Sequence, residues 1–181
     1  MSYPLGKDQF NNTNVVIAQT DSGTSNAVYP LETSDVLDLI LSTDTSIYAS
    51  GDVLADTQAL ADVVRLDAGT ARLESLVITD ADDQGEGLDI VFLKTNVSLG
   101  TENAAVSISD TNAKEILGII SVVSADFVDL GGVRVATVPM DRVIMLKAGT
   151  GSTSIYIGAI SRGTGTYTAS GLSLKIGIIR L

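Results

Sequence analysis

The chain has 181 residues, a formal charge of −11, and neither cysteine nor histidine. These absences exclude disulfide bonds, the usual zinc sites, Ser-His-Asp triads and Cys-His dyads. The 11 basic residues are scattered singly, which argues against a nucleic-acid surface, and no apolar run is long enough to cross a bilayer. Because 45% of the residues are hydrophobic, only 18% are charged and 17 are glycines, we expect one folded all-β domain with an arm.

Residues 1–30 differ in composition from the rest of the chain. They are polar and rich in turn formers, and residues 20–30 have the composition of a linker. We interpret 1–30 as an extended N-terminal arm and linker ahead of a β-sandwich domain at 31–181, with a first core strand as the alternative. Ordering an arm costs about 1–2 kcal/mol per residue, so it needs anchors that bind a partner. The candidate anchors are Tyr3, Leu5, Phe10, Val15, Val16 and Ile17.

Three short apolar stretches follow the arm. Residues 34–41 fit both a helical stripe begun by Ser34 and an alternating strand, and their short length and the turn after them favour the strand. Residues 46–54 and 59–66 are two more strand candidates, separated by a turn at 56–57.

The clearest local pattern lies in residues 72–94. Leu76 and Ile78 share one face of the first run, and Leu88, Ile90 and Phe92 share one face of the second, which is the period of a strand with one face on a core. Between them, residues 81–87 are acidic and contain two glycines, which adopt positive φ without steric cost. We predict a long β-hairpin with a solvent-exposed tip.

The second half of the chain is predicted to form further strands. Residues 95–114 break the alternation, and we expect a short helical turn begun by Ser109 or Asp110. Residues 115–123 are almost continuously apolar, which is typical of a central strand covered on both faces. The remaining strand candidates are 126–130 and 133–138, joined as a hairpin across two glycines, and then 143–147, 155–160 and 172–181.

The number and spacing of these strands predict the fold class. About nine to eleven strands, with turn signals every ~8–12 residues, are typical of a β-sandwich or jelly roll. We therefore predict an all-β protein, a jelly-roll-like β-sandwich with an extended N-terminal arm.

One acidic stretch is a candidate metal site. Asp80, Asp82, Asp83 and Glu86 have the composition of a calcium loop, but their spacing is not D-x-[DN]-x-[DN]-G with a closing Glu. We therefore favour a solvated hairpin tip over a metal site.

Other routes to catalysis are weak. The glycine loops at 149–152 and 163–165 lead into strands and lack the lysine of a phosphate loop, so we interpret them as hairpin turns. Paired carboxylates can hydrolyse glycosides, but the chain has no Trp and only 4% aromatic residues. We predict a non-enzymatic protein with no catalytic residue, metal, cofactor or small-molecule substrate.

A series of short motifs in a fixed order resembles one protein family. The motifs are YASGDVL at 48–54, DADDQ at 80–84, LDIVFL at 88–93, ENAA at 102–105, SIYIG at 154–158 and the closing Leu-x-Leu strand at 172–174. In this order, over roughly residues 46–181, the chain resembles the capsid decoration (cement) proteins of tailed bacteriophages, which are of the jelly-roll type.

The resemblance implies a structural protein of the virion. Such a subunit sits on the exterior of an assembled capsid, binds the major capsid protein, forms a homotrimer and grips neighbouring shell subunits with its arm. It would be made in the host bacterial cytoplasm, since the first residues lack the apolar core of a signal peptide. The alternatives are a host-attachment or glycan-binding module of a head fibre or tail, because jelly rolls also serve as lectins, and a glycan hydrolase.

Overall fold

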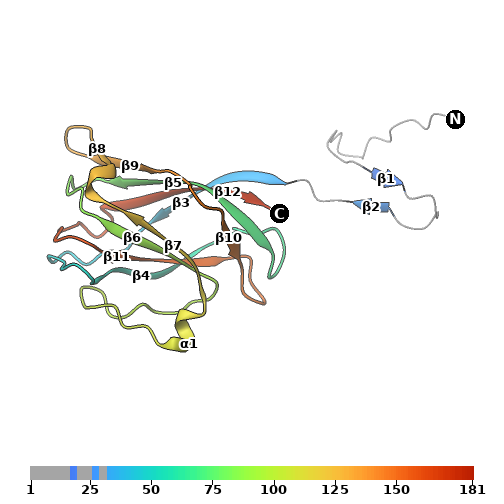
Figure 1. Cartoon of the computed structure of the whole chain (residues 1–181), viewed down its shortest axis with the longest axis horizontal. Coiled ribbons are helices and arrows are strands. Elements are labelled where there is room, and N and C mark those ends of the chain that lie inside the picture. The colour runs from blue at the N-terminus through green and yellow to red at the C-terminus, as the bar shows by residue number, and fades with distance from the viewer. Residues whose placement is uncertain (1–16, 20–25, 29–31) are drawn as a thin grey trace. The chain divides into compact units, whose positions relative to one another are not determined.

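The computed structural model describes residues 17–19, 26–28 and 32–181, and the chain divides between Thr33 and Ser34 into two units. In the first unit, β1 (Ile17–Gln19) pairs antiparallel with β2 (Asn26–Val28). The second unit is a sandwich of two antiparallel sheets (Figure 1).

The larger sheet has the strand order β3-β12-β5-β9-β8, and β10 pairs with β5 beside β9. Its strands are β3 (Thr33–Ile40), β5 (Thr70–Asp80), β8 (Phe127–Asp129), β9 (Arg134–Val138), β10 (Ile144–Lys147) and β12 (Leu172–Arg180). The smaller sheet has the order β4-β11-β6-β7. Its strands are β4 (Val53–Leu60), β6 (Leu88–Leu93), β7 (Ile116–Val122) and β11 (Ile155–Ser161).

This strand order is that of a jelly roll. Because β9 and β10 pair with different stretches of β5, they act as one strand interrupted at residues 139–143. The two sheets then read β3-β12-β5-β9/10 and β4-β11-β6-β7, with β8 added at one edge. Most connections between consecutive strands pass from one sheet to the other, as two Greek keys require. The predicted all-β sandwich is confirmed.

The main core lies between the two sheets, and the alternation of the last strand supplies part of it. The inward residues of β12 are all buried: Leu172, Leu174, Ile176 and Ile178. In β5, Leu73 and Leu76 both face the core, although three residues apart. The pairing with β12 is irregular between Gly177 and Ile178, where one residue of β5 is skipped. This bulge lets the side chains on both sides of it point into the core.

A smaller apolar cluster lies on the other face of the four-stranded sheet. β6 is buried along its whole length, and its outward Val91 and Leu93 pack with Leu99 and Ile160. Leu99 belongs to the β6–β7 connection, residues 94–115, which covers this face. The cluster therefore makes β6 the strand that is covered on both faces.

Several predicted elements are confirmed. Residues 34–41 form strand β3 rather than a helix, β8 and β9 form the hairpin across Gly131 and Gly132, and β10, β11 and β12 lie where expected. The short helix α1 (Asp110–Ala113) is capped by Ser109, whose side chain accepts a hydrogen bond from the Asn112 N–H at 3.2 Å. A 3₁₀ turn, η1 (Ser124–Asp126), precedes β8.

The predicted hairpin at 72–94 is wrong, although both of its strands exist. β5 pairs with β12, β9 and β10, whereas β6 pairs with β11 and β7 in the other sheet. Residues 81–87 are therefore a crossing between sheets. The glycine loops at 149–152 and 163–165 also join strands of different sheets, so they are not hairpin turns either.

The strands predicted at 46–54 and 59–66 are also wrong, because one strand, β4, runs through the expected turn at 56–57. The polar residues there have distant partners. Asp56 accepts a hydrogen bond from the Leu99 N–H at 2.8 Å, and the Thr57 hydroxyl donates to Asn96 at 3.1 Å. These bonds let polar side chains occupy a strand without ending it.

The prediction of a central, doubly covered strand at 115–123 is wrong as well. β7 is the edge strand of the four-stranded sheet, and Ile119 is 50% exposed. Within the described residues, no helix is long and apolar enough to cross a membrane.

Two buried tyrosines support the end of the sandwich where β4 begins. The rings of Tyr48 and Tyr167 are tilted, with their centroids 6.1 Å apart. The Tyr48 hydroxyl donates to the Leu54 carbonyl at 3.0 Å and accepts from the Asp44 N–H at 2.6 Å. Burial raises the pKa of Tyr48 to about 12 and also raises the pKa of Tyr167.

We expect alkaline pH to destabilise the fold through these tyrosines. Because the folded state holds both phenols neutral, their contribution is complete below the ordinary tyrosine pKa of 10.0 and is lost as the pH rises toward about 12. Urea unfolding across this range should give a falling free energy of unfolding, and the double variant Tyr48→Phe/Tyr167→Phe should show a smaller fall. Equal falls in both proteins would contradict this.

We also expect Gly158 to be required by packing. A Cβ at this position in β11 would lie 2.6 Å from Leu99 Cδ1 and 3.3 Å from the Ala55 carbonyl oxygen. Gly158→Ala should lower the free energy of unfolding by about 1–3 kcal/mol through overpacking. In the double variant with Leu99→Ala the two costs should be less than additive, since removing the leucine vacates the space; full additivity would argue against a clash.

Candidate functional site

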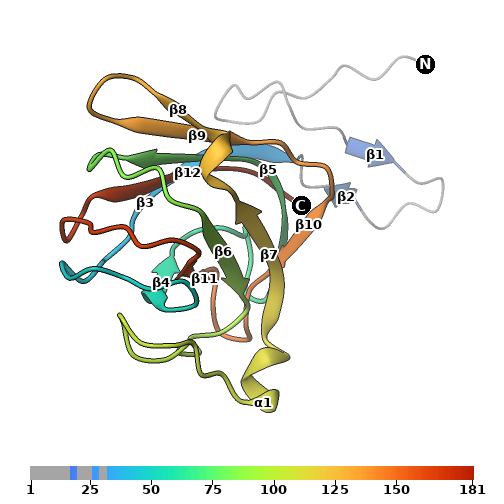
Figure 2. The same ribbon diagram turned by 60° about the vertical axis from the view of Figure 1, so that its left-hand side comes forward.

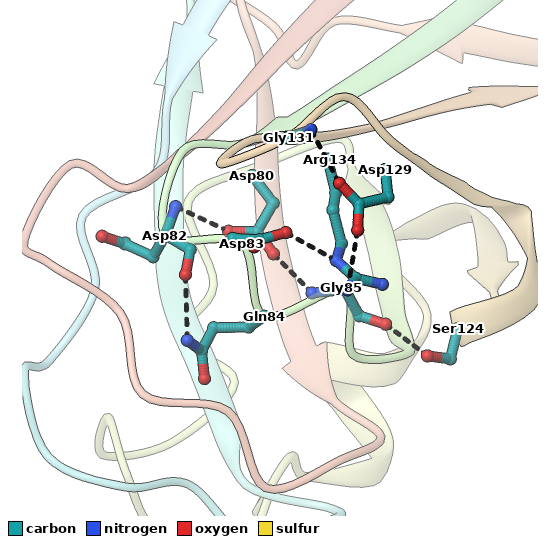
Figure 3. Close-up of polar contacts among 9 residues, drawn as sticks. All are labelled: Asp80, Asp82, Asp83, Gln84, Gly85, Ser124, Asp129, Gly131 and Arg134. Atoms are coloured by element: carbon teal, nitrogen blue, oxygen red, sulfur yellow. Dashed lines mark hydrogen bonds and ion pairs between the residues drawn. The ribbon is translucent and has the colours of Figure 1, made fainter.

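The crossing between β5 and β6 holds the acidic residues that resembled a calcium loop. Asp80, the last residue of β5, is fully buried. Its Oδ1 accepts a hydrogen bond from the Asp82 N–H at 3.0 Å, and its Oδ2 accepts from the Gly85 N–H at 2.7 Å (Figure 3). This carboxylate therefore closes the loop from inside, so the predicted solvated hairpin tip is wrong.

Arg134 of β9 fastens the crossing to the neighbouring hairpin. Its Nε donates to Asp83 Oδ1 at 2.8 Å, and its Nη2 lies 3.5 Å from Asp129 Oδ2 (Figure 3). The hydrogen bond to Asp83 raises the pKa of the Arg134 guanidinium above its ordinary value. Gly85 has a φ of +61°, and a Cβ there would lie 2.5 Å from Arg134 Cδ. Both observations explain why a glycine stands at this point.

The other side of the crossing is fastened to the β11–β12 connection. Asp82 accepts hydrogen bonds from the Thr168 N–H at 2.8 Å and from its hydroxyl at 3.1 Å, and Gln84 Oε1 accepts from the Thr166 N–H at 3.2 Å. The Ser124 hydroxyl donates to the Gly85 carbonyl, which adds the β7–β8 connection. The crossing thus braces three other connections.

The carboxylates of this acidic crossing hold the loop together and fasten it to its neighbours. Among the described residues, no three Asp or Glu side chains gather closely enough to hold a metal ion. Nearby, buried Asp89 of β6 is paired with Arg162, whose Nη2 lies 2.6 Å from Asp89 Oδ2. The carboxylates are engaged with backbone N–H groups, hydroxyls and arginines.

A groove beside β7 is the candidate interaction site. It is an open groove of about 610 Å³ between residues 118–121 of β7 and residues 138–144, where the strand formed by β9 and β10 is interrupted. Pro139 lies in the interruption and has no N–H with which to continue the ladder. Ile119 and Val143 line the groove and are 50% and 67% exposed. We call this feature the β7 groove.

One end of the β7 groove is closed by close packing. Ile144 of β10 lies against Gly118, where a Cβ would be 3.0 Å from Ile144 Cγ2. β10 and β7 thus come together across the two sheets (Figure 2), while β7 beyond Gly118 borders the open groove. The side chains of Asp126, Asp141 and Arg142 supply the charges around it.

The predicted arm anchors are mostly outside the described residues. Tyr3, Leu5, Phe10, Val15 and Val16 lie there, and Ile17 is the first residue of β1, opposite Val28. The structure therefore does not test these anchors. Sequence reasoning missed the β7 groove, although two signals were present: a strand without any charged residue, and a proline that ends β9.

Comparisons with known proteins add little. No protein-family model matches the chain, and no curated protein matches it. Among solved structures, the chain is similar to a chain of "Structure of infectious bursal disease virus Gt strain", with 10% identity and a TM-score of 0.20. That match covers 91% of this chain and 44% of the viral chain. A TM-score this low carries no argument about fold or function.

We expect the Asp80 carboxylate to be a major stabilising group of the crossing. Asp80→Ala removes the acceptor of two buried N–H groups and should lower the free energy of unfolding by about 2–4 kcal/mol. Asp129→Ala, which removes a carboxylate from an exposed position in the same network, should cost less than about 1 kcal/mol. Urea unfolding of both variants would check this, and equal losses would contradict the proposed closure.

Proposed function

We propose that this chain is a non-enzymatic structural protein of a tailed-bacteriophage virion, which binds the exterior of the assembled capsid and stabilises it. The observation that carries the proposal is the β7 groove, where apolar side chains and an uncharged strand edge are exposed on a chain with a net charge of −11. An unpaired strand edge flanked by exposed apolar side chains is a place where a partner can dock. The jelly-roll strand order agrees with a capsid-associated role.

The distribution of polar groups also favours binding over catalysis. In the described part of the chain, every buried side-chain nitrogen or oxygen has a hydrogen-bond partner. Asp80 and Asp82 belong to the stretch that resembled a calcium loop, and their carboxylates accept hydrogen bonds from backbone N–H groups. Chemistry would need such groups directed at a substrate.

The proposed partner is the major capsid protein, which the chain would bind as a homotrimer. Binding to an assembled shell, and not to free subunits, stabilises the shell by mass action. A free concentration of this protein that is 100 times the dissociation constant contributes about 2.7 kcal/mol per site. A trimer multiplies weak contacts through effective concentration. Residues 1–30, with anchors from Tyr3 to Ile17, would extend the contact area beyond the sandwich.

The proposal is tested with purified capsids that lack this protein. Added full-length chain should bind saturably and shift shell disruption to higher temperature or denaturant. Deleting residues 1–20 should lower the apparent affinity about tenfold for each 1.4 kcal/mol that the anchors contribute.

One outcome would remove the arm from the proposal, and a second would contradict the proposal as a whole. If occupancy stays unchanged without residues 1–20, these residues take no part in binding. If the full-length chain fails to bind shells but binds host cells or glycans saturably, it is an attachment module instead. The buried positions of Tyr48, Phe92, Phe127 and Tyr167 leave few aromatic rings for a sugar platform among the described residues.

A further inference from the structure

The outer strand edges of the sandwich are protected to different degrees. Unpaired edges recruit other strands, so proteins shorten them, charge them or cover them. β8 has only three residues, β10 has four and ends in Lys147, and β3 carries Asp35 and Asp38. The edge of β4 is covered at Val53, which hydrogen bonds with the 94–115 connection.

Among the described strands, β7 has an edge with none of these protections. Its seven residues, ILGIISV, include no charge and no proline, and Ile119 and Ser121 are exposed. The end near Gly118 is covered by Ile144, so the open part of the edge lies beyond Gly118. An exposed, uncharged strand edge of this kind is a ready template for a further strand.

A strand added to this edge would have two different faces, because successive side chains of a strand point to opposite sides. Ile119 and Ser121 are exposed on one face of β7, whereas Ile120 between them is buried in the main core. Across the β7 groove, Val138 and Ile144 also pack against this core. A side chain of the added strand beside Ile120 would therefore enter an apolar space between the two sheets.

The charges around the β7 groove favour an uncharged occupant. A charged side chain directed in beside Ile120 would lose its hydration, which is costly without a partner of opposite charge. The carboxylate of Asp126 already accepts a hydrogen bond from the Val123 N–H at 2.9 Å. Asp141 and Arg142, which are exposed at the rim, carry opposite charges. The groove thus offers apolar contact inside and little net charge outside.

The dimensions of the β7 groove indicate how much of a partner it can hold. One residue of a strand occupies about 3.3 Å along the strand, about 4.8 Å between strands and about 10 Å between sheets. A volume of about 610 Å³ therefore corresponds to roughly four residues. Residues 118–121 of β7, which line the groove, are a stretch of the same length.

We propose that an extended segment of the major capsid protein, uncharged over about four residues and with an apolar side chain directed into the β7 groove, adds to β7 as a further strand of the smaller sheet. Main-chain hydrogen bonds would provide affinity, and the inward side chain would provide selectivity. The inference rests on the proposed function, because it takes the capsid as the partner and states the chemistry by which this groove recognises it.

The first test measures binding of the full-length chain to capsids that lack it. Ile119→Lys places a charge on the β7 edge and should raise the dissociation constant about tenfold or more. Val128→Lys, the same change at the 61% exposed position of edge strand β8, should leave it within about twofold. Circular dichroism checks that both variants are folded.

The second test asks whether the contact is a strand ladder. Amide hydrogen exchange of the unsubstituted chain is measured by mass spectrometry, free and on occupied capsids. An added strand accepts hydrogen bonds from N–H groups of the β7 edge, so exchange in residues 116–122 should slow by about tenfold or more. Contact through side chains alone would leave these N–H groups exchanging at their free rate.

The third test identifies the segment that occupies the groove. Because the chain has no cysteine, Ser121→Cys can carry a benzophenone maleimide as its single photo-cross-linker. Irradiation on capsids should join it to a capsid-protein segment with at least four consecutive uncharged residues, and adding Ile119→Lys should remove this product. The same probe on Val128→Cys should not label that segment.

Three results would overturn the inference. They are equal effects of the two lysine substitutions on capsid binding, unchanged exchange of residues 116–122 on occupied capsids, and cross-links from position 121 to the arm of the same chain or to a second copy in place of the capsid protein. In each case the unsubstituted chain still binds capsids. Failure of the proposed function is a different result, the absence of that binding.

Discussion

The structure depends on one feature of its topology: the chain crosses between the two packed sheets at most of its connections. A crossing takes backbone N–H groups into the interior, where an unpaired donor is costly. At the β5–β6 crossing, the buried carboxylate of Asp80 provides the partner, because it accepts hydrogen bonds from the N–H groups of Asp82 and Gly85. Arg134 and Thr168 then tie neighbouring connections to the same loop. The acidic residues that resembled a metal site in the sequence therefore hold the β5–β6 crossing in place.

The sequence predicted strands better than it predicted their partners. Alternation identifies which residues of β12 or β6 share a face, because that depends only on the period of two. A hairpin and a crossing between sheets, however, both consist of alternating runs around a glycine-containing turn. The difference is decided by β12 and β11, which lie far along the chain and pair with β5 and β6. Similarly, Asp56 in β4 resembled a turn residue because its partner, the Leu99 N–H, belongs to a distant connection.

The candidate site could be predicted only in part for the same reason. Aromatic and β-branched residues on a polar arm are visible in the sequence as candidate anchors. The β7 groove is not, because it forms only when topology brings β7 beside the interruption between β9 and β10. The almost continuously apolar run at 115–123 predicted burial on both faces. An edge strand that awaits a partner has the same composition, and exposure of Ile119 distinguishes the two.

Charge explains why an uncharged strand edge suits this protein. A chain of −11 repels its own copies and other acidic surfaces over roughly the 8–10 Å that salt leaves unscreened. Contacts are therefore favoured where charge is absent, and backbone hydrogen bonds at an edge add a register that an apolar patch lacks. A slip of one residue would turn the side chains of an added strand to the opposite face. An edge also accepts one strand at a time. A partner that meets this edge with one uncharged strand would therefore be held in a single register.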